Sequence, residues 1–180
     1  DQMNDRPTTN FATLNPLDVS YGSGPIFSEG NLEMEFATGG NTGRGVPTIR
    51  PSSGKWYGEF YIITDDRFVI GVMNESNSGE LGTSTNSARV NTDGTTYYDS
   101  SAGSSYSDAF ADEDIVQFAL NLDNNVLWFG INNTWQNSAT ESEIEAGTAT
   151  NSFTTHIGST TPITGDGIAI VVEDNSPSGP

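Results

Sequence analysis

Carboxylate pairs are the first residues of this sequence that could do chemistry. Glu33 and Glu35 stand two apart, and on a strand such residues share a face at roughly 7 Å between Cα atoms. A retaining glycoside hydrolase uses two carboxyl groups about 5–5.5 Å apart as acid and nucleophile. The alternation with Leu32, Met34 and Phe36 is also typical of a strand whose acidic face lies in water. We therefore expect Glu33 and Glu35 to form the solvated face of a strand.

The sequence evidence for two further catalytic sites is weak. Glu141, Glu143 and Glu145 repeat the spacing of a glycosidase motif, but without strand-forming neighbours. His156 is the single histidine and the only possible base of a Ser-His-Asp triad. The chain has no Gly-x-Ser-x-Gly turn. We expect no enzyme activity, with a glycoside hydrolase as the least favoured alternative.

Calcium is the one candidate cofactor. Ca²⁺ takes about six to eight oxygen ligands from carboxylates, amides and backbone. Asp112, Asp114, Asp123 and Asn125 could supply them, as could the pair at 65–66. The alternative is that these acidic turns are simply solvated.

Aromatic residues in polar segments form a candidate binding site. Stacked rings suit sugars and also anchor protein interfaces. The alternative is a small satellite core beneath long loops. The candidates are Tyr97, Tyr98, Tyr106, Phe110 and Trp135.

Composition narrows the function classes. The chain has 180 residues, a formal net charge of −18 and no cysteine. Such a charge argues against nucleic acid and anionic lipid as partners, because both are bound through Lys and Arg. The length fits one domain with a real core.

The elements that must position these residues are short strands. Alternating or β-branched runs bounded by turn residues predict an all-β sandwich or barrel with almost no helix. One helical turn is expected at 141–146. The expected strands are 32–36, 55–63, 67–73, 88–90, 95–98, 114–122, 126–131, 153–157 and 167–172.

The predicted core comes from the strands at 55–63, 114–122 and 126–131. Tyr57 and Trp128 should lie on the opposite faces from their neighbours. The expected core residues are Trp56, Phe60, Phe118, Leu120, Leu127 and Phe129.

Three segments resemble SPRY domains. Residues 53–60 (SGKWYGEF) and 68–72 (FVIGV) resemble two successive SPRY strands, and 114–132 resembles the hairpin that follows them. Residues 10–17 (NFATLNPL) with 29–32 (EGNL) resemble the leader of SPRY-like domains in bacteriophage structural proteins. The expected Gly of the hairpin is Asn133 here, and no Asn-Phe-Gly closes the chain.

This resemblance implies a two-sheet antiparallel β-sandwich of the SPRY or concanavalin type. It divides the chain into a leader at 1–28 that packs on the domain, a sandwich at 29–173 and a tail at 174–180. It also implies binding without catalysis.

The leading hypothesis is a bacteriophage virion protein in a fibre, tail appendage or capsid decoration. It would present loops to other virion proteins, to copies of itself in a homo-oligomer, or to a glycan or protein of the host surface. A carbohydrate-binding module, with or without Ca²⁺, is the alternative.

Overall fold

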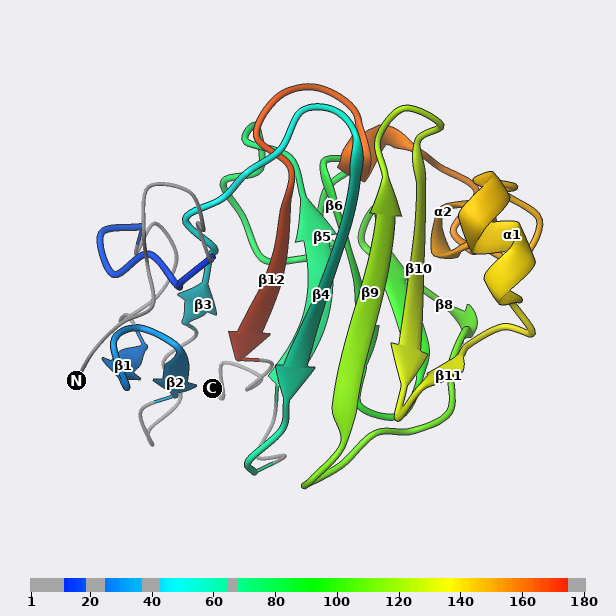
Figure 1. Ribbon diagram of the computed structural model, residues 1–180. Helices are drawn as coiled ribbons and strands as arrows, with labels where there is room; N and C mark the ends of the chain where they lie inside the picture. The colour runs from blue at the N-terminus through cyan, green and yellow to red at the C-terminus, as the bar shows by residue number, and fades with distance from the viewer. Residues whose placement is uncertain (1–11, 19–24, 37–42, 65–67, 175–180) are drawn as a thin grey trace.

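Two antiparallel β-sheets packed face to face form a sandwich (Figure 1). The computed structural model describes residues 12–18, 25–36, 43–64 and 68–174. The predicted all-β sandwich is therefore confirmed. Among the described residues, no helix is long and apolar enough to cross a membrane.

The first sheet has four strands in the order β11-β10-β9-β4. These are β4 (Lys55–Tyr61), β9 (Ile115–Asn121), β10 (Val126–Ile131) and β11 (Thr134–Trp135). The predicted hairpin joins β9 to β10, and its turn ends at Asn125, whose φ of 54° an asparagine adopts readily. Strand β4 occupies one edge of this sheet.

The second sheet has six strands in the order β3-β12-β5-β6-β7-β8. These are β3 (Arg44–Gly45), β5 (Phe68–Met73), β6 (Ser87–Asn91), β7 (Thr95–Tyr98), β8 (Ser101–Ser105) and β12 (Ala169–Asp174). The segment from 74 to 112, which shows few strand signals in the sequence, supplies three of them. The acidic pair at 65–66, which could also supply calcium ligands, lies outside the described residues.

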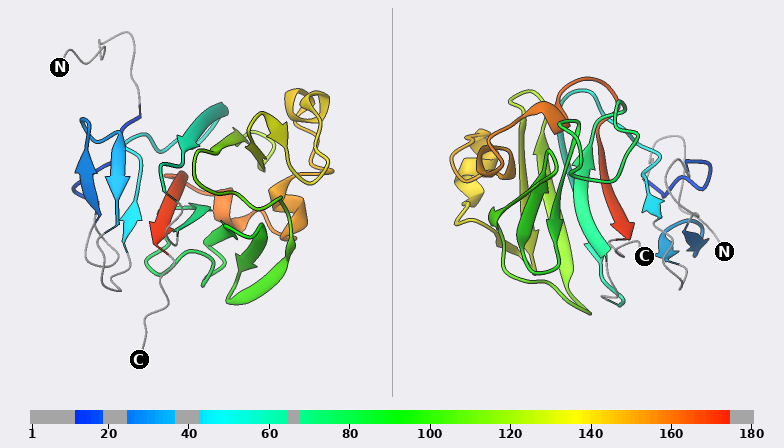
Figure 2. Two further views of the ribbon diagram at one scale, coloured as in Figure 1. Left: turned by 90° about the horizontal axis from the view of Figure 1, so that it is seen from below. Right: turned by 180° about the vertical axis from the view of Figure 1, so that it is seen from behind.

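A separate hairpin of β1 (Ile26–Ser28) and β2 (Glu33–Glu35) lies beside the sandwich (Figure 2). The expected boundary between residues 28 and 29 falls inside this hairpin. Leu14 pairs with Pro47 in an isolated bridge, and its N–H donates to Asn31 O over 2.8 Å. Residues 10 and 11 of the leader, and 175–180 of the expected tail, lie outside the described residues.

Alternation along the strands divides the apolar residues between the core and the outer faces. Leu120, Leu127 and Phe129 are buried between the sheets, as predicted. Trp128 lies in a different cluster on the outer face, also as predicted. Phe60 and Phe118 are only partly buried against the core. Trp56 was expected in the core, but its position on an edge strand leaves it 41% exposed.

Helices occupy the connection between β11 and β12. The expected turn is α1 (Glu141–Ala146), which Thr140 begins with a capping box and Gly147 ends at φ 70°. The strand expected at 153–157 is wrong: these residues form α2 (Phe153–His156), capped by Ser152. A short 3₁₀ helix follows at Thr161–Ile163.

The loop from 74 to 86 covers the outer face of the six-stranded sheet. Leu81 is fully buried there with Val69 and Val171. The N–H of Leu81 donates to Glu173 Oε1 over 3.0 Å, and Arg44 Nε donates to Glu173 Oε2 over 2.7 Å. An ion pair inside the protein thus holds the loop onto the sheet.

Candidate binding surface at strand β4

Strand β4 carries large side chains on both of its faces although it lies at a sheet edge. Trp56, Gly58 and Phe60 stand opposite Leu120, Phe118 and Val116 of β9 and so point toward the core side. Tyr57 and Tyr61 point to the outer side and are 57% and 60% exposed. The edge position causes this exposure, since no further strand of the described chain covers β4.

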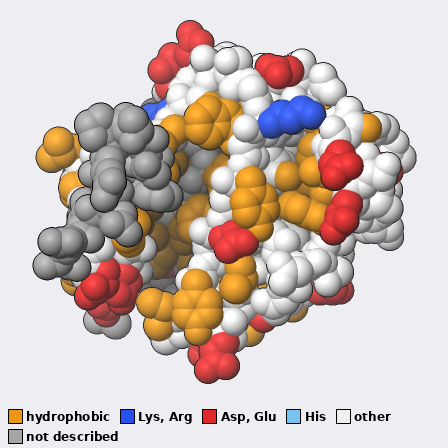
Figure 3. All heavy atoms as spheres, viewed as in Figure 1, with side chains coloured by type: hydrophobic (Ala, Val, Ile, Leu, Met, Phe, Trp, Pro, Cys, Tyr) orange, Lys and Arg blue, Asp and Glu red, His pale blue; other side chains and the backbone are white. Residues whose placement is uncertain are grey.

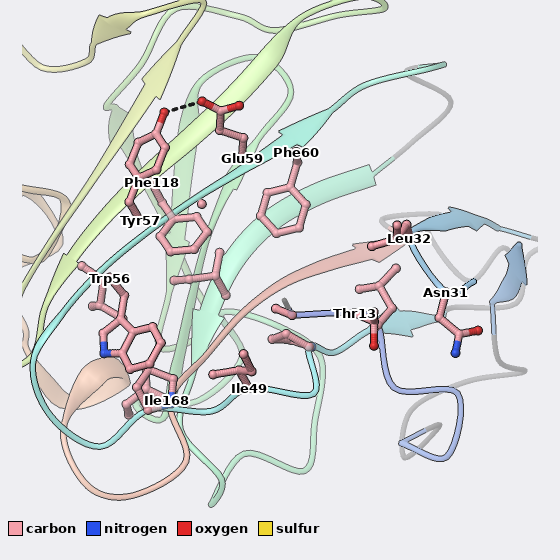
Figure 4. A pocket seen from close by; sticks show the side chains of 17 residues that line it. Thr13, Asn31, Leu32, Ile49, Trp56, Tyr57, Glu59, Phe60, Phe118 and Ile168 are labelled. Carbon is pink, nitrogen blue, oxygen red and sulfur yellow. Dashed lines mark hydrogen bonds between the residues drawn. The ribbon is translucent and has the colours of Figure 1, made fainter. Parts of the chain in front are cut away.

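A groove of about 410 Å³ opens on the core side of β4 (Figure 4). One wall is β4 itself, and the opposite wall comes from segments at 12–14, 31–32 and 47–51. The space-filling view shows this hollow with hydrophobic side chains along it (Figure 3). Its lining is largely apolar and includes Leu32, Ile49, Trp56, Phe60 and Ile168.

Gly58 helps to shape the groove. A Cβ atom at this position would lie 2.6 Å from the ring of Phe118. The Phe118 ring lies 6.2 Å from that of Phe60, centroid to centroid. The aromatic floor therefore requires glycine at position 58, and we call the resulting hollow the edge groove.

A second depression of about 400 Å³ lies on the outer side of β4, toward α1. Tyr57 lines both hollows, and its hydroxyl donates a hydrogen bond to Glu59. That bond and the nearby negative charge raise the pKa of Tyr57 to about 12. Tyr57 thus stays protonated near neutral pH and can act as a hydrogen-bond donor.

The predicted platform of loop aromatics is wrong for two of its members. Tyr106 and Phe110 are each 3% exposed and belong to the core. Tyr106 packs edge-on against Phe153 at 5.3 Å, and Phe110 contacts Phe68 at 5.8 Å. Their rings are covered because they pack among the core residues of both sheets.

The other three predicted aromatics are half-buried and lie apart. The Tyr97 ring lies under the Arg89 guanidinium at 4.7 Å, and the Tyr98 hydroxyl donates to Ser159 Oγ over 2.7 Å. Trp135 packs on the outer cluster of Ala119, Val126 and Trp128. Binding by these residues stays a prediction, and the structure gives no common platform for them.

The four predicted calcium ligands are divided between opposite ends of β9. Asp112 and Asp114 precede this seven-residue strand, and Asp123 and Asn125 follow it. Such a strand spans roughly 23 Å, so the four cannot share one ion. Asp114 accepts hydrogen bonds from Ala111 N and Asn132 Nδ2, and Asp123 accepts one from Gly54 N. Within the described ranges, no three acidic or histidine side chains cluster as a metal site.

The candidate catalytic groups are equally dispersed. Glu33 and Glu35 lie on β2, outside the sandwich. Glu141, Glu143 and Glu145 belong to α1, where residues two apart point in nearly opposite directions. His156 Nε2 lies 3.4 Å from Ser104 Oγ, but no described carboxylate accepts a hydrogen bond from the ring.

The sequence did not predict the edge groove. Trp56 was expected in the core because a strand pattern does not indicate which strand lies at the edge of a sheet. The aromatic residues on both faces of 55–61 were the available signal.

Comparison with known proteins supports the fold. No family model and no curated protein matches the chain. Among solved structures, the SPRY domain of human HERC1 is similar with a TM-score of 0.65 and 16% identity. The match covers 91% of this chain and 90% of that one. The chain therefore has a SPRY-like fold.

Proposed function

We propose that this chain is a non-catalytic binding domain that recognises a protein through the edge groove. The observation that carries the proposal is the apolar hollow beside β4, where Leu32 and Trp56 are 63% and 41% exposed. Large apolar side chains around a hollow are typical of interaction sites. Trp56 comes from the sandwich, and Leu32 comes from the turn of the β1–β2 hairpin beside it.

The same proposal extends to a bacteriophage virion. Its support is the sequence resemblance of residues 10–17 and 29–32 to the leader of SPRY-like phage structural proteins. The domain would sit in a fibre, tail appendage or capsid decoration, with other virion proteins and further copies of itself as partners. Antibodies against the chain should then label intact phage particles.

A carbohydrate ligand is the second candidate. Trp56 and Tyr57 present partly exposed rings beside the groove, and sugar rings stack on such faces. A glycan array separates this candidate from the first one.

The test is a selection of displayed peptides on the purified chain, run in parallel with the glycan array. We expect peptide ligands whose binding is lost in Trp56→Ala. Tyr61→Ala is the matched control, because Tyr61 is an exposed aromatic of β4 that does not line the groove. Both variants must keep the wild-type melting temperature within a few degrees.

Binding that Trp56→Ala leaves unchanged would overturn the assignment of the groove. Glycan binding without peptide binding would favour the carbohydrate alternative.

A further inference from the structure

We infer that the ligand of the edge groove is an extended segment of a partner protein that adds to β4 as a fifth strand. This inference rests on the proposed binding function and deepens it. The partner segment would alternate apolar side chains, which enter the groove, with polar and basic ones on the outer face.

Within the part of the chain that the structure describes, one edge of β4 has no backbone partner. Leu122 N donates to Gly54 O over 2.9 Å, and Ile62 N donates to Asp114 O over 2.9 Å. Even-numbered residues of β4 therefore direct their backbone groups toward β9, and odd-numbered ones direct them away. No described residue forms a backbone hydrogen bond with Lys55, Tyr57 or Glu59 on that free side.

This edge lacks the usual protection against strand pairing. Natural edges carry prolines, bulges or inward-pointing charges. β4 pairs with β9 in unbroken register over its seven residues and contains no proline. Lys55, at the start of the strand, is its one basic residue. A free edge of this length is a template for an added strand.

The two faces of β4 favour a partner segment in which apolar and polar residues alternate. Backbone pairing with Lys55, Tyr57 and Glu59 puts the side chains of the paired partner residues on the outer face. The intervening partner residues then face the groove, opposite Trp56, Gly58 and Phe60. The Phe118 ring lies against Gly58 and forms an apolar floor for these side chains, between Trp56 and Phe60.

Charge favours a basic segment over a second copy. The chain has 24 acidic and 6 basic residues, so another copy would bring the same excess of negative charge. Glu59 is exposed on the outer face of β4, where it would lie beside the outward side chains of the added strand. A lysine or arginine in that position gains a favourable pairing.

The free edge itself can be tested first by amide hydrogen exchange in the unliganded protein. We expect fast exchange at Lys55, Tyr57 and Glu59 and slow exchange at Trp56, Gly58 and Phe60. Uniform protection along β4 would overturn the inference, because the edge would already be paired.

The probe is a synthetic seven-residue peptide of alternating lysine and valine, with blocked ends. Its binding should slow exchange at Lys55, Tyr57 and Glu59 by about tenfold or more. Two N-methylated versions of equal charge provide the matched control. Methylation of the lysine amides, which face β4, should abolish binding, whereas methylation of the valine amides should not.

A protein variant gives an independent measurement. Glu59→Pro removes an N–H that points to the free edge, so the fold should tolerate it while strand addition is blocked. Glu59→Gln keeps the N–H and should weaken binding only by the loss of charge. If Glu59→Pro fails to fold, the methylated peptides still decide.

The outcomes separate the two proposals. Equal binding of both methylated peptides, or no binding of the unmethylated probe, overturns strand addition. Ligands from the displayed selection that still depend on Trp56 would then leave the binding function in place.

Discussion

Inside the core, the hydroxyl of Tyr106 accepts a hydrogen bond from Phe129 N over 3.2 Å. Burial raises the pKa of this hydroxyl, so Tyr106 stays protonated. Phe129 C=O accepts from Gln136 N, which shows that this residue directs its backbone away from β9. Tyr106 thus satisfies a buried backbone group, which gives it a structural role in place of the predicted binding role.

Tyr106→Phe should therefore destabilise the fold. It leaves the N–H of Phe129 without its partner, at a cost of about 1–3 kcal/mol. Urea unfolding measures the loss. Tyr97→Phe is the control, because the Tyr97 hydroxyl bonds Ser100 O at the surface; a similar loss in both variants would contradict the explanation.

The pair of Arg44 and Glu173 should show strong coupling. Both side chains are almost fully buried. Burial acts to raise the pKa of Glu173, and the charge of Arg44 opposes this shift. Glu173→Gln removes the buried carboxylate that pairs with Arg44, which should cost about 3–5 kcal/mol.

A double-mutant cycle tests this coupling. The cycle compares Arg44→Met, Glu173→Met and the variant with both substitutions. The double variant removes both members of the pair together, so it should lose much less than the sum of the two single variants. Additive losses, measured by denaturant unfolding, would show that the pair does not act as a unit.

At the scale of elements, capping decided between helix and strand. Ser152 Oγ accepts from Thr155 N and begins α2, where β-branched and aromatic residues at 153–157 predicted a strand. Phe153 then packs against Phe129 at 5.2 Å. Tertiary contacts of this kind override local propensity.

The capping box of α1 should make this helix sensitive to acid. Glu143 Oε2 accepts from Thr140 N over 2.8 Å, and this bond lowers the pKa of Glu143 below 4.5. The carboxylate therefore stabilises the fold above its ordinary pKa, and that contribution is lost as the pH falls through the lowered value. Glu143→Ala should be less stable than the wild type at neutral pH.

Thermal unfolding at about pH 7 and about pH 3 checks this dependence. The difference in melting temperature between Glu143→Ala and the wild type should shrink on acidification. Glu141→Ala is the control, because Glu141 lies outside the capping box. A difference that does not change with pH would contradict the role of the carboxylate.

At the scale of the whole molecule, charge opposes compactness. The net charge of −18 produces repulsion that salt screens over roughly 8–10 Å at moderate ionic strength. The melting temperature should rise between about 20 mM and 500 mM NaCl. Sucrose at equal osmolarity serves as an uncharged control, and a fall in melting temperature with salt would contradict the prediction.

Self-association is the second expectation for the whole molecule. Light scattering at low and high salt should give a trimer or a larger assembly if this chain contains its own oligomer interface. High salt should favour the assembly, because screening weakens the repulsion between copies. A monomer under both conditions would contradict self-association of this chain.

The sequence alone determined most of the local structure. Alternating apolar residues predicted the strands at 114–122 and 126–131, which form the hairpin of β9 and β10, and the single helical turn expected at 141–146 is α1. These features depend on neighbours in the chain, so periodicity and turn chemistry are sufficient to predict them. The same alternation placed Trp128 on the face opposite Leu127 and Phe129.

Only the tertiary structure decided which of these residues face solvent. Strand patterns are the same in the middle and at the edge of a sheet, so Trp56 looked like a core residue until β4 proved to be an edge strand. Tyr106 and Phe110 were expected at the surface because their segment is polar, but both side chains belong to the core. Strand order and loop path arise from contacts distant in sequence, and these contacts created the edge groove.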